Sequence, residues 1–111
     1  MEQEVMQSYI DGLNHSDAKL IGSLFAADGQ FNDAAGRLSG APVVTAVGSD
    51  AVRAVFERIF ARQSVQAKVL KMNPPSMEYD VIRSDGTIYP CIGTVMINTE
   101  GKITEYLVRP R

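Results

Sequence analysis

In the first half of the chain, apolar residues recur three or four positions apart in three stretches, which predicts three amphipathic helices. The first helix opens the chain and carries the apolar stripe Val5, Met6, Tyr9, Ile10 and Leu13. The second begins near Ser16 or Asp17, since both residue types cap helices, and ends at Asp28-Gly29. The third follows Gly48-Ser49-Asp50. Short strands are expected at 30–33 and 43–46.

In the second half the apolar residues alternate with polar ones, which is typical of strands. Alternation over 65–69 and 77–81 predicts two strands, and Ser84-Asp85-Gly86 indicates a hairpin turn into a long strand over 87–98. A turn at 100–102 leads to a last strand over 103–108. Helices followed by strands predict an α+β fold. We expect a curved antiparallel sheet wrapped around three N-terminal helices, forming a cone whose open end suits a pocket.

Length and charge narrow the classes of protein to consider. The 111 residues fit a single domain spanning 1–111, and a net charge of −2 gives no field that would attract nucleic acid or an anionic membrane. No apolar run approaches the roughly 20 residues of a membrane span. The single cysteine, Cys91, has no partner for an internal disulfide, which favours a reducing compartment. The acidic start of the chain does not resemble a signal peptide, so a cytoplasmic location is expected.

Asp33 is the first candidate for chemistry. It follows the apolar Phe31 at strand spacing and enters the run Ala34-Ala35-Gly36, so it has few polar neighbours in sequence. Pointing into a pocket, such a carboxylate can act as a general base. The alternative is that Asp33 ends a strand and caps the following turn. Tyr9, on the stripe of the first helix, is either a hydrogen-bond donor to a substrate or a core tyrosine.

Four segments carry a family resemblance: residues 5–14 with Asp17, Leu24-Phe25-Ala26-Ala27-Asp28, Asp33-Ala34-Ala35-Gly36, and Ala51-Val52-Arg53. The order of elements and these segments resemble the nuclear transport factor 2-like superfamily, also called SnoaL-like, and within it the bacterial steroid Δ-isomerases. The resemblance implies a cone-shaped, cystatin-like α+β barrel that pairs as a homodimer through its outer sheet face. It also implies that Asp33 is the catalytic base, that Tyr9 donates to the oxyanion, and that no cofactor is needed.

The chain departs from the isomerase pattern at two positions. The second, protonated acid of the isomerases aligns with Gly93, and the tyrosine on the third helix aligns with Phe56. Tyr89 and Cys91 share a strand face with Gly93 at period two, so the Tyr89 hydroxyl or the Cys91 thiol is a candidate to replace the missing donor. The candidate substrate-binding residues are therefore Phe56, Tyr89, Cys91 and Gly93. Packing of Tyr89 and Cys91 in the core or at a dimer surface is the alternative.

Other kinds of site find little support in the sequence. His15 is the only histidine, and no residues cluster at the spacing of metal ligands. The epoxide hydrolases of the superfamily use an Asp-Arg-Asp set. Arg83 is a candidate for its arginine, and Asp80, if it points inward, is a candidate for a second carboxylate.

Two functions from different classes follow. The first is an isomerase-like enzyme that moves a proton next to the carbonyl of a hydrophobic ketone, steroid-like or polyketide-like. The second is a non-catalytic module that binds a small hydrophobic molecule or mediates dimerisation.

Overall fold

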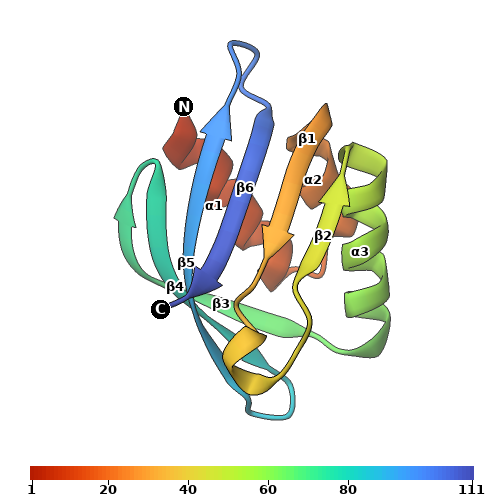
Figure 1. Ribbon diagram of the computed structural model, residues 1–111, viewed down its shortest axis with the longest axis vertical. Coiled ribbons are helices and arrows are strands. Elements are labelled where there is room, and N and C mark those ends of the chain that lie inside the picture. Colours follow the sequence, from red (N-terminus) through yellow and green to blue (C-terminus); the bar gives the residue numbers. More distant parts are fainter.

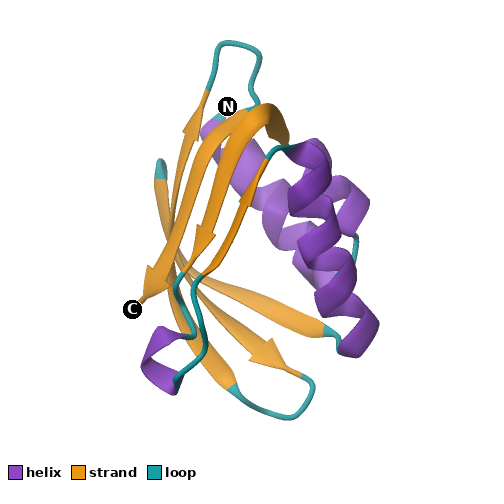
Figure 2. Cartoon of the chain, turned by 45° about the vertical axis from the view of Figure 1, so that its right-hand side comes forward, coloured by secondary structure: helices purple, strands orange, loops and turns teal.

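The computed structural model describes residues 1–111. Three helices, α1 (Glu2–Asn14), α2 (Ala18–Ser23) and α3 (Ser49–Arg62), cover one face of a curved six-stranded sheet (Figure 1, Figure 2). The strands are β1 (Phe25–Asp33), β2 (Val44–Val47), β3 (Val65–Asn73), β4 (Ser76–Arg83), β5 (Ile88–Ile97) and β6 (Ile103–Pro110). A short 3₁₀ helix, η1 (Arg37–Ser39), lies between β1 and β2. The α+β cone expected from the sequence is confirmed.

The strand order in the sheet is β2-β1-β6-β5-β4-β3, with β2 and β3 as free edges. Four of the neighbouring pairs are antiparallel, as expected, and β1 with β6 is a parallel pair. A parallel pair needs a long connection, and β1 and β6 are far apart in sequence, so the last strand can enter beside β1 in the same direction. This pairing sets Asp33, the last residue of β1, beside Val108 of β6.

The second helix is shorter than the sequence pattern predicts, and β1 is longer. The helix ends at Ser23 instead of Asp28-Gly29, and β1 begins at Phe25. Backbone pairing explains the difference, because the Leu24 carbonyl accepts a hydrogen bond of 2.8 Å from the Ile103 amide and Phe25 pairs with Ile103. The start of this helix is as predicted, with the Asp17 side chain accepting from the Leu20 amide at 3.0 Å.

The core lies between the helices and the inner face of the sheet. Its largest fully buried side chains are Tyr79, Tyr106, Phe31, Met6, Ile21 and Met77. Residues of one strand alternate between this core and the outer face, which is why Tyr79, Val81 and Arg83 of β4 all point inward. Toward the β4–β5 hairpin the inward residues become partly exposed, so the core gives way to an open end.

Candidate active site

A cavity of about 250 Å³ opens where the loop after β1, the end of α3 and the β4–β5 hairpin come together. These segments meet at the lower end of the view in Figure 1. The walls are mostly apolar, with Val44, Ile59, Val65 and Val81 among them. Asp33 is the only carboxylate among the lining residues. A small apolar cavity with few polar groups is the usual form of a ligand site.

Asp33 enters the cavity because of its place in β1. It lies two residues after the buried Phe31 and therefore on the same, inner face of the strand. The Ala34 amide still donates to the Val108 carbonyl at 2.7 Å, and the chain then turns away from the sheet. The Ala35 amide donates to Asp33 Oδ1 at 2.9 Å. Asp33 thus caps the turn with one oxygen and lines the cavity as well, so the two interpretations of this residue are compatible.

The surroundings of Asp33 favour its protonated form. Burial raises the pKa of the Asp33 carboxyl, and the hydrogen bond from Ala35 lowers it by less. Asp33 takes part in no ion pair, and no cation offsets the effect of burial on its pKa. Oδ2 has no protein hydrogen-bond partner. The carboxylate is therefore desolvated and has an oxygen free to accept a proton.

Tyr89 forms a polar group with Arg83 and Gln63 on the wall of the same cavity. Arg83 Nε donates to Gln63 Oε1 at 2.7 Å, and Arg83 Nη1 donates to the Tyr89 hydroxyl at 3.0 Å. The Arg83 guanidinium also lies 5.8 Å from the centre of the Tyr89 ring. Because the Tyr89 oxygen accepts from Arg83, its own O–H is free to donate.

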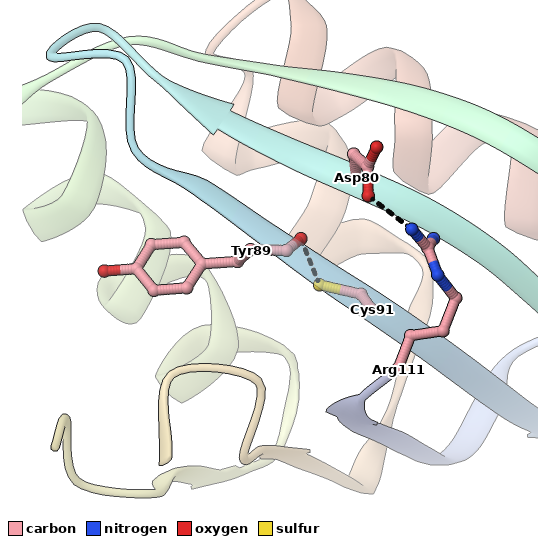
Figure 3. A network of polar contacts seen from close by, with 4 residues as sticks. All are labelled: Asp80, Tyr89, Cys91 and Arg111. Atoms are coloured by element: carbon pink, nitrogen blue, oxygen red, sulfur yellow. Dashed lines mark hydrogen bonds and ion pairs between the residues drawn. The ribbon is translucent and has the colours of Figure 1, made fainter. Parts of the chain in front are cut away.

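Cys91 lines the cavity as an inert thiol. Its Sγ donates to the Tyr89 carbonyl at 3.2 Å (Figure 3). Burial, followed by the charges of Asp33 and Asp80, raises the pKa of the Cys91 thiol to about 12. Because the thiolate is the nucleophilic form, a thiol with this pKa is not a nucleophile at neutral pH.

Tyr9 and Phe56 lie deeper, in an aromatic cluster that does not line this cavity. The Tyr9 ring packs 4.6 Å from the Tyr106 ring and edge-on to Phe56 at 6.0 Å. Burial raises the pKa of Tyr9 well above its usual value, and the charges of Tyr106 and Asp33 add to this. Tyr9 is therefore a neutral phenol within electrostatic reach of Asp33, although its side chain is enclosed by the core.

Gly93 also lies outside the cavity lining, and the space over it is occupied. A Cβ atom at this position would come within 2.5 Å of the Tyr106 hydroxyl oxygen. That hydroxyl shares a buried hydrogen bond of 3.1 Å with the hydroxyl of Tyr79. A tyrosine pair thus fills the space over Gly93, and only glycine leaves room for it.

Solved structures similar to this one share its architecture across the whole chain. A protein with a ketosteroid isomerase-like fold from Catenulispora acidiphila, solved in complex with trimethylamine, superposes with a TM-score of 0.73 at 17% identity over 95% of this chain and 83% of its own. An NTF2-like protein of unknown function from Cytophaga hutchinsonii superposes with a TM-score of 0.73 at 16% identity, over 100% of this chain and 90% of its own. The chain has the nuclear transport factor 2-like fold.

A further neighbour with this fold is a SnoaL-like family protein from Agrobacterium tumefaciens, proposed to be an isomerase. Its TM-score is 0.71 at 17% identity, over 100% of this chain and 99% of its own. No protein-family model and no curated protein matches the sequence significantly. The superpositions establish the nuclear transport factor 2-like fold. At identities this low they establish the fold alone, and the chemistry has to be argued from the site.

Two further features of this domain bear on its chemistry. Asp80 does not face the cavity but forms a 3.0 Å ion pair with Arg111, on the other side of the sheet from the Tyr89 ring (Figure 3). An Asp-Arg-Asp set with Asp33 and Arg83 is therefore not assembled. No group of three or more His, Cys, Asp or Glu side chains is placed to hold a metal ion, and no helix is long and apolar enough to cross a membrane.

Three residues of the site region were not predicted from the sequence: Gln63, Tyr79 and Tyr106. Tyr79 and Tyr106 alternate with polar residues like any core strand residue, so their mutual hydrogen bond gave no local signal. Gln63 ends α3 next to the start of β3 and meets Arg83 through the pairing of β3 with β4. The contact between Gln63 and Arg83 could be predicted only from the register of β3 with β4, which sets Val65 opposite Arg83.

Proposed function

We propose that this domain catalyses proton transfer next to the carbonyl of a hydrophobic ketone, steroid-like or polyketide-like, with Asp33 as the general base. The observation that carries the proposal is the state of Asp33, whose carboxylate is desolvated, lies in an apolar cavity, has no cationic partner and keeps one oxygen free. A raised pKa brings a carboxylate toward the range in which it accepts and returns protons efficiently.

The proposed reaction needs no cofactor. Asp33 takes the proton from the carbon beside the carbonyl, and the electron pair of that C–H bond moves onto the carbonyl oxygen to give an enolate. The protonated Asp33, which exchanges its proton with solvent through the open end of the cavity, then delivers a proton to another carbon of the conjugated system, which restores the carbonyl and shifts the double bond. Nothing is oxidised or reduced, so hydrogen bonds to the enolate oxygen are the stabilisation required.

Two tyrosines are proposed as donors to the enolate oxygen. Tyr89 lines the cavity together with Asp33 and has a free O–H, since Arg83 donates to its oxygen. Tyr9 is the donor implied by the isomerase resemblance, and the charge of Asp33 contributes to its raised pKa, but its side chain lies behind the cavity wall. Tyr89 reaches a ligand in the observed arrangement, whereas Tyr9 requires the wall to open.

Replacing each tyrosine with phenylalanine tests the proposed donors. With a β,γ-unsaturated 3-ketosteroid as substrate, Tyr89→Phe is expected to lower the rate of conversion to the conjugated isomer by about 10²–10³-fold, the usual cost of one oxyanion donor. The rate is measured by the absorbance of the conjugated product, at saturating substrate. A similar loss for Tyr9→Phe supports Tyr9 as the second donor, and a loss of less than about tenfold removes Tyr9 from this role.

A non-catalytic role in binding a small hydrophobic molecule is the second proposal. The observation in its favour is that Tyr9, Phe56 and Gly93, which occupy positions of the isomerase hydrogen-bond network, all lie outside the cavity. Under this proposal Asp33→Asn leaves ligand affinity and biological activity unchanged. Filling the cavity with Val81→Phe removes both, because Val81 is a wall residue.

The homodimer implied by the resemblance is also a proposal. Met96 of β5 is 57% exposed and Leu107 of β6 is 41% exposed, and both lie on the outer face of the sheet. Tyr106 and Val108, which alternate with Leu107 along β6, are buried in the core. The apolar residues of β6 are thus divided between the core and the outer face.

A further inference from the structure

A second, larger cavity of about 510 Å³ adjoins the one that holds Asp33. The two share Val44, Ile59, Gln63 and Arg83 as wall residues, so they lie side by side. The inner part is predominantly apolar. The outer part is bordered by the exposed turns of α3 and by the β4–β5 hairpin, where the chain meets solvent.

The outer cavity carries an excess of positive charge. Arg58, Arg62 and Arg83 line it, and Asp85 is the only acidic residue among its walls. Arg58 and Arg62 lie one turn apart on the same face of α3, a spacing at which like charges repel each other. Neither takes part in an ion pair or a side-chain hydrogen bond, whereas Arg53 on another face of the helix pairs with Glu57 at 3.4 Å. In a chain with a net charge of −2, this concentration of arginines is local.

Arg83 joins the two parts of the site, and its orientation is fixed. Nε is held by Gln63 and Nη1 by Tyr89, and the Nη2 amino group has no protein acceptor. The side chain is partly buried and lines both cavities. The free Nη2 amino group can donate charge-assisted hydrogen bonds to a carboxylate, sulfate or phosphate. Asp85 forms no ion pair with Arg83, and its Oδ1 accepts from the Thr87 amide at 2.9 Å.

The volumes also indicate a ligand that extends through both parts. The inner cavity alone, at about 250 Å³, is smaller than the roughly 300–1,000 Å³ of common small-molecule sites, and the joined cavities fall within that range. A ligand that fills both cavities extends from Asp33 past Arg83 to the arginines of the outer cavity.

We propose that the physiological ligand is an anionic amphiphile, with an apolar body in the inner cavity beside Asp33 and a carboxylate, sulfate or phosphate held by Arg83, Arg58 and Arg62. The proposal rests on the proposed function for the identity of the inner cavity as the ligand site, and it adds the charge of the ligand. Arg83 is a specificity-determining residue in this arrangement, and the two helix arginines set the electrostatic attraction.

The test compares binding of one ligand with and without its charge. The probes are a 3-ketosteroid with a side-chain carboxylic acid, its methyl ester and its sulfate analogue, and affinities are measured by isothermal titration calorimetry. All measurements use the Asp33→Asn background, so that the probes are not converted while their affinity is measured. The acid or the sulfate is expected to bind about tenfold to a hundredfold more tightly than the ester, the size of one or two charge-assisted hydrogen bonds. Whichever of the two anions binds more tightly identifies the head group.

Arginine variants assign the preference to the outer cavity. Arg83→Gln and the double variant R58Q/R62Q should each reduce the ratio of acid to ester affinity, and the ratio should approach one when all three are replaced. R58Q/R62Q alters only exposed residues, so it keeps the test valid if Arg83→Gln impairs folding. Arg53→Gln on the same helix is the matched control and should leave the ratio unchanged.

Equal affinity for acid and ester in the unmodified outer cavity would overturn the proposal, whatever the outcome of turnover assays. A preference for the anion that persists in all arginine variants would do the same. Failure of the proposed function has a different signature: an anion preference that depends on the arginines, without any proton transfer by the wild-type protein. The two proposals can therefore fail independently.

Discussion

Asp33→Asn is expected to lower proton transfer by about 10²–10⁴-fold, the usual contribution of a general base. Asparagine has the shape of aspartate but cannot accept a proton from carbon. Its Oδ1 can keep the hydrogen bond from the Ala35 amide, so the turn after β1 should be preserved. The rate is measured with the β,γ-unsaturated 3-ketosteroid, and affinity for the conjugated ketone is measured alongside it. Unchanged turnover in Asp33→Asn would contradict the role of this residue.

The pH dependence of the wild-type rate is a second test of the Asp33 carboxylate. The carboxylate must be ionised to act as a base, and burial raises its pKa above the ordinary value for aspartate. The value of kcat/KM should therefore be constant at high pH and fall as the pH drops through this raised pKa. A fall that occurs only at the pKa of an unperturbed aspartate would show that Asp33 is solvated in the active protein.

Gly93→Ala is expected to destabilise the fold by about 1–3 kcal/mol, the usual cost of an overpacked core position. Alanine ordinarily improves on glycine inside a strand, so destabilisation here would be diagnostic. The reason is the Tyr106 hydroxyl oxygen, 2.5 Å from where the added Cβ would be, which must move and thereby disturb its hydrogen bond with Tyr79. The free energy of unfolding is measured by urea denaturation monitored by circular dichroism.

A double-mutant cycle identifies the cause of that loss. In a Tyr106→Phe background the oxygen at 2.5 Å is absent, and the nearest ring atoms lie 3.1 Å from the added Cβ. Adding Gly93→Ala to Tyr106→Phe should therefore cost less than adding it to the wild type. Equal costs in the two backgrounds would show that the phenol does not fill the space over Gly93.

The sequence predicts the elements that depend on periodicity. The helices α1 and α3, the β4–β5 hairpin and the turn at 100–102 follow from local patterns of apolar residues, caps and glycines. The sharing of one face of β5 by Tyr89 and Cys91 also follows from alternation. That this face lines the cavity at both residues is known only from the structure. The position of Asp33 on the same side as Phe31 follows for the same reason.

The sequence does not predict what depends on pairing between distant segments. The early start of β1 is determined by the backbone bond between Leu24 and Ile103, which are far apart in the chain. The Tyr106 phenol reaches the space over Gly93 only because β5 and β6 pair in one register, with Val95 opposite Tyr106. The tertiary fold likewise brings Arg83 of β4 to Gln63, the residue that follows α3. Such contacts carry no local sequence signal, and they decide which polar groups reach the cavity.

The most direct test of Asp33 as a general base is hydrogen–deuterium exchange at the carbon beside the carbonyl of a bound ketone. Proton NMR follows a 3-ketosteroid in deuterated buffer with wild-type protein and, separately, with Asp33→Asn. Wild-type protein is expected to accelerate the loss of that proton signal by at least about 10²-fold over Asp33→Asn, because Asp33 removes the proton. Exchange at the rate of buffer alone, with the ketone shown to be bound, would contradict a role of this site in proton transfer.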